Sequence, residues 1–350
     1  MIPEHKDEER DDAVSELFSD ETAESPKHVS TIPVVPQLSV ALGILVFVFG
    51  VTYVGASHSL KEQSAAADEV RVDTTLADRS HDEAARVGAF DDVSLEAKGA
   101  IVWDVKNQKA LYAKNADESL PLASVTKLMT ALLTYELLSP EDRVTITRRA
   151  IEVEGDSGFA DGEEFTMQDL ADLTLITSSN DGATALGART GEVLSSSNPD
   201  AAFVEAMNVR AEELGLTQTS FKNPTGLDLS PTEPGALGSA RDVARLMDFI
   251  VTNVPDAVAL TNVDLTTIDN ARGQYHIAKN TNIDVATIDG LIASKTGYTD
   301  LAGGNLVVAF NAGLNRPVVV AVLGSSFNGR FADVSDLVAR TRRYVSESSR

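Results

Sequence analysis

A serine and a lysine three positions apart could supply a nucleophile and its base. Ser124 and Lys127 stand in the run Ala-Ser-Val-Thr-Lys, and in a helix positions i and i+3 share one face. A lysine desolvated near another cation loses its proton more easily and can then activate a serine hydroxyl. A serine in the first helical turn would also place backbone N–H groups near a developing oxyanion. Chance supplies about one such spacing in a chain of this length, and a helix cap followed by a solvated lysine is the other interpretation.

A second polar group lies between two predicted helices. Ser178-Ser179-Asn180 follows an apolar helical run and precedes a second helix. The Ser178 hydroxyl could relay a proton to a leaving amine, and the Asn180 carboxamide could hydrogen-bond a substrate backbone. The same Ser-x-Asn pattern begins at Ser196 and at Ser326. Each copy taken alone is therefore better interpreted as a turn or a cap.

A third group, Lys295-Thr296-Gly297, occurs once in the chain. At the end of a strand beside a cleft, the lysine ammonium and the threonine hydroxyl would bind a substrate carboxylate. Gly297 would let the substrate backbone approach the strand closely. Taken alone, the tripeptide fits the end of a strand that leads into a turn.

Hydrophobic periodicity predicts the elements that must position these groups. Early strands, a helical middle and late strands predict an α+β domain whose sheet joins both ends of the chain. The predicted strands are 100–105 and 109–113, which form a hairpin, and 288–295, 305–310 and 318–323. The predicted helices are 124–138, 166–178, 181–190, 200–214, 239–252 and a last one from about 332.

In this order the three motifs resemble those of the penicillin-recognising serine enzymes. Over about residues 94–325 the chain looks like the serine-type D-alanyl-D-alanine carboxypeptidases, the low-molecular-mass penicillin-binding proteins. The resemblance implies a β-lactamase/transpeptidase-like fold, with an antiparallel sheet of about five strands, flanking helices and a helical subdomain. The flanks that carry it are Leu122–Thr130, Glu154–Gly158, Leu175–Asp181, Met207-Asn208, Asn223–Asp228 and Lys295–Gly303.

The resemblance also implies a reaction and its partners. The enzyme would remove terminal D-Ala from peptidoglycan stem peptides that end in D-Ala-D-Ala, and β-lactam antibiotics would acylate it. Neither a metal nor a cofactor is implied. The implied catalytic residues are Ser124 as acylated nucleophile, Lys127 as base and Ser178. The implied substrate-binding residues are Asn180, Lys295, Thr296, Gly297 and Tyr298, with the backbone N–H groups of Ser124 and Tyr298 as oxyanion hole.

One departure from the family pattern affects the strand that carries the third motif. The family usually has Asp-Gly, one apolar residue and then Lys-Thr-Gly. Here Asp289-Gly290 is followed by Leu-Ile-Ala-Ser before Lys295. The extra residues leave the register of this strand open.

Several other functions compete with this interpretation. D,D-endopeptidase action on cross-links would use the same residues, and a catalytically silent peptidoglycan-binding module is an alternative from another class. Gly155–Gly158 matches the nucleophile motif of chymotrypsin-like proteases, which need a histidine base. Of five histidines only His276 lies in the catalytic domain, which also disfavours a zinc peptidase. A class A β-lactamase needs a deacylating glutamate, and the only near match, Glu205, lies in an apparent amphipathic helix.

Composition excludes further classes. The 350-residue chain has 53 acidic and 29 basic residues, a formal charge of −24, so phosphate backbones would be repelled and nucleic acid is not an expected partner. The chain has no cysteine, which excludes disulfides, thiolate metal sites and a cysteine nucleophile.

The N-terminal part predicts attachment to a membrane. Residues 1–31 are polar and acidic and predict a disordered tail. Residues 32–57 contain no charge and are long enough to span a bilayer as a helix, here an uncleaved signal anchor, with a cleaved signal peptide as the competitor. Residues 58–92 predict a polar spacer, and 93–350 the catalytic domain. Lys27 precedes this segment and Lys61 and Arg71 follow it, so the count of positive charges slightly opposes an N-terminus inside the cell. The implied chemistry nevertheless favours a single-pass protein with its catalytic domain outside the cytoplasm.

Overall fold

The computed structural model describes residues 88–155 and 157–348. The predicted tail, the predicted membrane segment and residues 58–87 of the predicted spacer lie outside the described residues. Within the described ranges, no helix has the length and apolar character needed to cross a bilayer.

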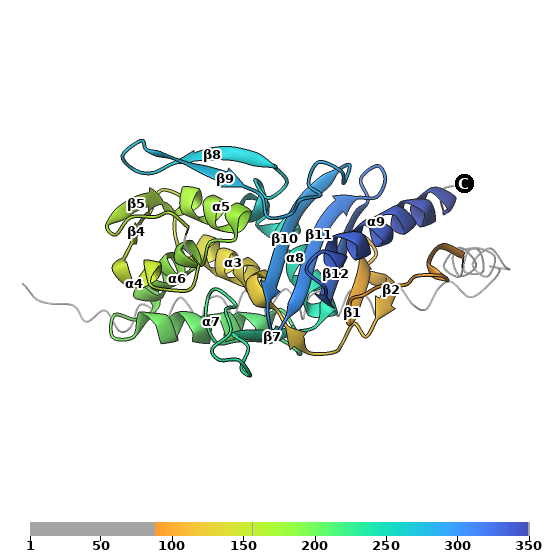
Figure 1. Ribbon diagram of the computed structural model, residues 1–350, viewed down its shortest axis with the longest axis horizontal. Helices are drawn as coiled ribbons and strands as arrows, with labels where there is room; N and C mark the ends of the chain where they lie inside the picture. Colours follow the sequence, from red (N-terminus) through yellow and green to blue (C-terminus); the bar gives the residue numbers. More distant parts are fainter. Residues whose placement is uncertain (1–87, 156, 349–350) are drawn as a thin grey trace, which may run out of the picture. The chain divides into compact units, whose positions relative to one another are not determined.

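A five-stranded antiparallel sheet forms one side of the folded domain (Figure 1). Its strand order is β10-β11-β12-β1-β2, so strands from both ends of the domain meet at its centre. Gly99 lies opposite Leu323 in the register of β1 with β12. The α+β class and the sheet built from both ends are thereby confirmed. The strands are β1 (Gly99–Asp104), β2 (Lys109–Lys114), β10 (Leu291–Thr299), β11 (Gly303–Asn311) and β12 (Pro317–Ser325).

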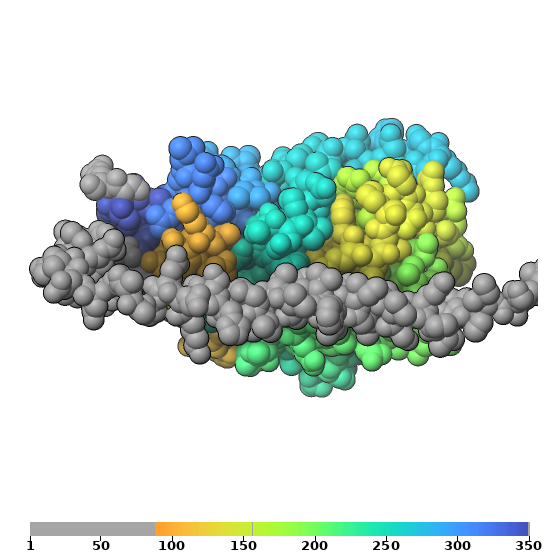
Figure 2. Space-filling view, turned by 180° about the vertical axis from the view of Figure 1, so that it is seen from behind, coloured from red at the N-terminus to blue at the C-terminus, as the bar shows by residue number. Residues whose placement is uncertain are grey.

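Helices cover both faces of this sheet, which explains why its strands are so rich in apolar residues. Helix α8 (Ala240–Asn253) packs on one face and α9 (Gly329–Glu347) on the other. Because both faces are covered, β1, β11 and β12 are almost continuously apolar rather than alternating. Seen from behind in Figure 2, the teal segment that contains α8 lies between the blue and orange strands and the yellow helical part.

The core under α9 extends to the first described residues. Ala89 and Phe90 are buried there, and the Phe90 ring stacks on Tyr112 with centroids 5.6 Å apart. Arg340 of α9 donates to the carbonyl of Ala89. Packed structure therefore begins before residue 93, where sequence patterns place the start of the domain.

A helical subdomain lies beside the sheet (Figure 1). It contains its own core, which includes Val144, Phe165 and Leu170. The β4–β5 hairpin lies at its outer edge, and Glu154, in the connection that leads to β5, lies near the start of α6. Its elements are α3 (Lys127–Leu137), β4 (Arg143–Ile146), α4 (Arg148–Ile151), β5 (Glu163–Thr166), α5 (Met167–Thr177), α6 (Asn180–Leu194) and α7 (Pro199–Glu213).

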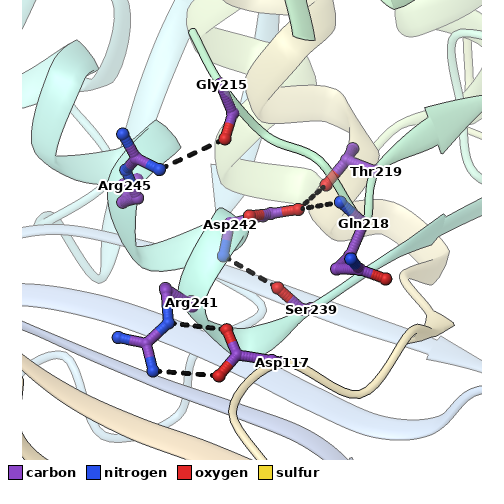
Figure 3. A network of polar contacts seen from close by, with 8 residues as sticks. All are labelled: Asp117, Gly215, Gln218, Thr219, Ser239, Arg241, Asp242 and Arg245. Atoms are coloured by element: carbon purple, nitrogen blue, oxygen red, sulfur yellow. Dashed lines mark hydrogen bonds and ion pairs between the residues drawn. The ribbon is translucent and has the colours of Figure 1, made fainter. Parts of the chain in front are cut away.

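A small three-stranded sheet and a polar network join the two parts of the domain. The carboxylate of Asp242, in the first turn of α8, accepts from Gln218 N at 2.7 Å and from Thr219 Oγ1 at 2.9 Å (Figure 3). The neighbouring Arg241 makes a two-bond ion pair with Asp117. The beginning of α8 thereby fixes the segments that lead into β3 and β6. The strands are β3 (Leu120–Pro121), β6 (Ser220–Phe221) and β7 (Ala236–Gly238), in the order β3-β7-β6.

The strand that carries the third motif differs from its prediction. We predicted 288–295, with the motif at the strand end, but β10 runs from Leu291 to Thr299 and the motif lies within it. A register shift between Leu291 and Ala293 accommodates the residues that follow Gly290, so Lys295 pairs with Val307 in a regular ladder. The sequence patterns did not predict the hairpin that precedes β10. It consists of β8 (Leu265–Asp269) and β9 (Tyr275–Lys279) and lies over α5 in Figure 1.

Candidate active site

Ser124 lies in a 3₁₀ turn rather than in the α-helix that we predicted from this residue onward. The turn, η1 (Ala123–Thr126), leads directly into α3, whose first residue is Lys127. Ala123 has a positive φ of 47°, which explains why the helix does not begin earlier. The buried Asn305 of β11 donates to the carbonyls of Pro121 and Leu122 at 2.9 and 3.0 Å. The sheet therefore holds the segment just before the serine.

Lys127 is completely buried, and its amine makes three short contacts. The Nζ atom lies 2.8 Å from Ser124 Oγ, 2.7 Å from Asn180 Oδ1 and 3.0 Å from the carbonyl oxygen of Thr225. The amide and carbonyl oxygens can only accept hydrogen bonds. A neutral amine would give one hydrogen to each of them and direct its lone pair at the Ser124 hydroxyl. This geometry suits a base that removes the serine proton.

The surroundings of Lys127 favour its neutral form. Burial, followed by the positive charge of Lys295, lowers the pKa of Lys127 well below its ordinary value, while Asp181 opposes the shift. A lysine that is desolvated beside a second cation loses its proton more easily and can then act as a base, and Lys127 meets this condition.

A loop between β6 and β7 presents the Thr225 carbonyl to Lys127. The Asn223 side chain shapes this loop, because its Oδ1 accepts from Thr225 N, Thr225 Oγ1 and Gly226 N, and its Nδ2 donates to Leu227 O. Gly226 has a φ of 78°, and a Cβ there would lie 1.9 Å from the carbonyl oxygen of Ala123. Only glycine allows the loop to pack so closely on the turn that holds Ser124.

The second motif faces Ser124 from the helical subdomain. Ser178 ends α5 in a left-handed conformation (φ 61°), and Asn180 begins α6. The Asn180 amide bridges two parts of the site, since Oδ1 accepts from Lys127 and Nδ2 donates to the carbonyl of Glu154 at 2.7 Å. Between them Ser179 caps α6 and donates to Ser157 Oγ at 2.7 Å.

The third motif faces the second across the cleft. Lys295 Nζ donates to Ser178 Oγ at 2.8 Å and to the carbonyl of Thr296 at 2.9 Å. Burial, followed by the charge of Arg330, lowers the pKa of Lys295 to about 7. β10 is the edge strand of the sheet, and on its outer side the N–H of Ser294 donates to Thr261, while no further strand in the described part of the chain pairs with the motif residues there. The structure thus brings residues of all three motifs together.

Gly297 is the point at which β10 crosses the turn of Ser124. A Cβ on Gly297 would lie 2.8 Å from Leu122 O and 3.2 Å from Ser124 N. The N–H groups of Ser124 and of Tyr298, the next residue in β10, therefore belong to segments in direct contact. The Tyr298 ring is half exposed and meets Phe327 edge to face at 5.1 Å.

Sequence reasoning missed a third buried cation at this site. Arg330 of α9 donates to the carbonyl of Gly297 at 2.8 Å, and its guanidinium lies over the Phe327 ring. Burial lowers the pKa of Arg330 to about 10. No sequence pattern singles out this arginine, because it reaches the site only through the packing of α9 on the sheet.

The alternative motifs have structural roles. Ser157 bonds to Ser179. His276 Nε2 lies 2.6 Å from Glu163, and its ring packs against Phe159 and Phe165. Neither residue supplies the serine–histidine pair of a chymotrypsin-like site. Among the described residues, no group of histidine, aspartate and glutamate could hold a metal ion.

The remaining alternatives are also accounted for locally. Glu205 lies in α7, where a helix was predicted, and its side chain is exposed. Asn198 and Asn328 occupy the N-cap positions of α7 and α9 without a side-chain cap bond, whereas Ser326 Oγ accepts from the first N–H of α9, that of Gly329, at 2.9 Å.

Comparison with known proteins decides the family. The model of the D-alanyl-D-alanine carboxypeptidase family, peptidase S11, matches residues 85–326. The chain belongs to this family. It is 32% identical over 253 residues to D-alanyl-D-alanine carboxypeptidase DacF of Bacillus subtilis, covering 71% of this chain and 62% of the relative. A D-alanyl-D-alanine endopeptidase of Pseudomonas aeruginosa is 29% identical, with 72% and 77% covered.

Solved structures agree with the family assignment. Penicillin-binding protein D2 of Listeria monocytogenes, in its cefotaxime-bound form, has a TM-score of 0.60 and 27% identity, covering 71% of this chain and 98% of the other. A serine-to-alanine mutant of the DD-transpeptidase of Streptomyces K15 has a TM-score of 0.65 at 23% identity, which establishes the transpeptidase-like fold, with 71% and 99% covered. The chain spans about three-fifths of the length of the carboxypeptidases DacF and DacC that it matches.

Proposed function

We propose that this chain is a serine-type D,D-carboxypeptidase that releases the terminal D-Ala from stem peptides ending in D-Ala-D-Ala. The observation that carries the proposal is the pair of contacts of Ser124 with Lys127 and of Ser178 with Lys295 in one cleft. A nucleophile with its base faces a hydroxyl and an ammonium that suit a leaving amine and a terminal carboxylate. Membership of the family supports the same reaction.

Acylation follows from the roles of the polar groups. Neutral Lys127 accepts the Ser124 proton while Oγ attacks the carbonyl carbon of the scissile peptide bond. The N–H groups of Ser124 and Tyr298 stabilise the oxyanion. The C–N bond then breaks, and the departing D-Ala amine receives a proton through Ser178. Water hydrolyses the resulting ester and restores Ser124.

Substrate orientation would come from the edge strand and the cations beside it. Lys295 and Thr296 would hold the terminal carboxylate, and Asn180 would bond the peptide backbone. A cavity of about 460 Å³ is lined by Glu154 and Thr225, whose carbonyls hold Asn180 and Lys127, but by none of the motif residues.

The test combines labelling and turnover in the purified chain. Fluorescent penicillin should label the wild type, and a peptide ending in D-Ala-D-Ala should lose D-Ala. Ser124→Ala should abolish both, with a loss of at least about 10³-fold, because no other described residue replaces the nucleophile. Absence of Ser124-dependent labelling would contradict the mechanism.

An endopeptidase is the second candidate, because relatives named D-alanyl-D-alanine endopeptidases are matched over a larger share of their length than the carboxypeptidases. Cross-linked peptide dimers distinguish the two activities. Cleavage of dimers without release of D-Ala from monomers would favour the endopeptidase. Labelling by penicillin without either cleavage would favour a peptidoglycan-binding role.

We also propose that residues 32–57 anchor the catalytic domain to the outer side of a bacterial cell membrane. The support is the uncharged apolar run in the sequence. External protease applied to intact spheroplasts should digest the catalytic domain, and the protein should sediment with membranes. Recovery in the soluble cytoplasmic fraction would refute the anchor.

A further inference from the structure

A threonine outside the three motifs lies against the part of the cleft that would bind the substrate carboxylate. The hydroxyl of Thr281, in the connection between β9 and β10, lies 2.6 Å from the hydroxyl of Thr296. The backbone N–H of Thr281 donates to the carbonyl of Ile176 at 3.1 Å, two residues before Ser178. Thr281 therefore contacts both walls of the cleft, one through its side chain and the other through its main chain.

Neighbouring asparagines hold Thr281 in place. The buried Asn280 donates to Thr261 O at 2.9 Å, and its Oδ1 accepts from Asn282 N at 2.9 Å. Thr261 in turn bonds to Ser294 of β10 through its own hydroxyl and carbonyl, at 3.1 and 3.0 Å. The position of Thr281 relative to β10 is thus fixed by contacts that do not involve its hydroxyl.

We propose that Thr281 is a positioning residue whose hydroxyl donates to Thr296 Oγ1 and thereby directs the Thr296 proton to the substrate carboxylate. Each hydroxyl has one hydrogen, so only one of the two can donate within the pair. A carboxylate accepts only, and it selects the arrangement in which Thr296 donates outward and Thr281 donates to Thr296. Consecutive hydrogen bonds of this kind strengthen one another, most of all when the last acceptor is charged.

This inference rests on the proposed function, since it requires a ligand with a carboxylate at this position. Thr281→Val in the full chain tests it, because valine keeps the shape and the backbone bond to Ile176 but removes the hydroxyl. We expect kcat/KM for a peptide ending in free D-Ala-D-Ala to fall about threefold to tenfold, the usual worth of one hydrogen bond. The same peptide with an amidated C-terminus should be processed at an unchanged rate.

Two further variants separate positioning from a structural effect. Thr281→Ser restores the hydroxyl and should restore the preference for the free acid. Thr287→Val is the matched control, because this exposed threonine lies in the same connection and its hydroxyl bonds to the carbonyl of Asp284 rather than to a motif residue. Melting temperatures of all three variants should stay close to that of the wild type.

Acylation by benzylpenicillin and by its methyl ester gives an independent measure. Thr281→Val should slow acylation by the free acid and leave the rate of acylation by the ester unchanged. Equal losses for acid and ester, no loss for either, or failure of Thr281→Ser to restore the difference would each overturn the inference. A wild-type chain that reacts with penicillin but releases no D-Ala would instead contradict the proposed carboxypeptidase activity, and the acid-to-ester ratio would still decide the role of Thr281.

Discussion

The roles proposed for Lys127 and Lys295 require opposite protonation states. The proposed base must be neutral, whereas a lysine that binds a carboxylate must be charged. Burial lowers the pKa of both, and the charge of Lys295 further favours the neutral form of Lys127. The cleft therefore works only in a window of pH in which Lys127 has lost its proton and Lys295 has kept it.

This opposition predicts a bell-shaped dependence of kcat/KM on pH. The rate should rise with pH as Lys127 is deprotonated, through its lowered pKa. It should fall above about pH 7, because Lys295 has a lowered pKa of about 7 and is neutral at higher pH. Steady-state release of D-Ala, followed from acid to alkaline pH, checks both limbs.

An amidated peptide provides the control for the falling limb. It does not need the charge of Lys295, so its kcat/KM should lack the loss near the pKa of about 7. Identical profiles for the free acid and the amide would show that Lys295 is not the group responsible.

At the scale of elements, β10 and η1 act as one unit. The edge strand brings Lys295 and Thr296 to the cleft, and Gly297 allows the strand to cross the Ser124 turn at contact distance. Asn305 of the adjacent strand β11 holds the same turn from the side. The spacing between nucleophile and carboxylate site is consequently set by close backbone packing and by one buried asparagine rather than by flexible side chains.

Gly297→Ala should damage this unit. The added Cβ would lie 2.8 Å from the carbonyl of Leu122, a backbone atom that cannot turn aside, so the strand or the Ser124 turn must shift. Because a displacement of about 1 Å can cost on the order of 10² in rate, acylation by fluorescent penicillin should slow by about 100-fold.

Gly313→Ala is the matched control for this substitution. Its Cβ would approach only the side chain of Val345, at the far end of the sheet. Both variants should fold, as judged by circular dichroism, and only Gly297→Ala should be acylated more slowly by fluorescent penicillin. Unchanged labelling of Gly297→Ala would show that the close crossing is unimportant for catalysis.

The sequence predicted the long elements because their periodicity is a property of neighbouring residues. The paired strands β1 and β2, the helices from α5 to α8 and the five-stranded sheet follow from local pattern and from the family resemblance. The hairpin β8–β9 was missed, because its outer face exposes Leu265, Tyr275 and Ile277 instead of alternating with polar residues. The predicted start of a helix at Ser124 was wrong, since tertiary contacts of Ala123 and Leu122 impose a 3₁₀ turn.

Site residues divide in the same way. The motif residues could be found from sequence because their spacing is short and their order is shared with a family. Arg330 and Thr281 could not, since each reaches the cleft from a separate element and its side chain makes a single hydrogen bond to a motif residue. Nothing in the sequence near either residue distinguishes it from an ordinary polar residue on the surface of a helix or a loop.

At the scale of the whole molecule, the distribution of charge is uneven. The chain carries a formal charge of −24, yet Lys127, Lys295 and Arg330 are buried together around one cleft. An anionic substrate terminus would be repelled by most of the surface and attracted only locally. Binding of the free-acid peptide should therefore depend on these few cations rather than on long-range steering.

A buried carboxylate ties the beginning of the domain to its last helix. Asp333 of α9 accepts from the backbone N–H groups of Glu96 and Ala97 at 3.0 and 2.9 Å, and from Ser325 Oγ at 2.7 Å. Asp333→Ala would leave these donors without their acceptor, so we expect the free energy of unfolding to fall by about 2–4 kcal/mol.

Urea denaturation of two variants from the same helix tests this prediction. Asp336 is partly exposed and pairs with Arg340 one turn later, so Asp336→Ala should cost less than about 1 kcal/mol. Equal losses for the two aspartates would mean that the link between Asp333 and the first residues of the domain adds no more stability than a partly exposed ion pair.

The strand order of the sheet also has a consequence for how the chain is made. β1 needs β12 as one of its two neighbours, and Gly99 pairs with Leu323, so that partner leaves the ribosome long after β1 does. Until then the side of β1 that later pairs with β12 presents unpaired backbone N–H and C=O groups among almost entirely apolar side chains, and such an edge is prone to pair with another chain. Such long-range pairing folds slowly. During synthesis this domain therefore depends on being kept apart from its own copies until its last strand and helix emerge.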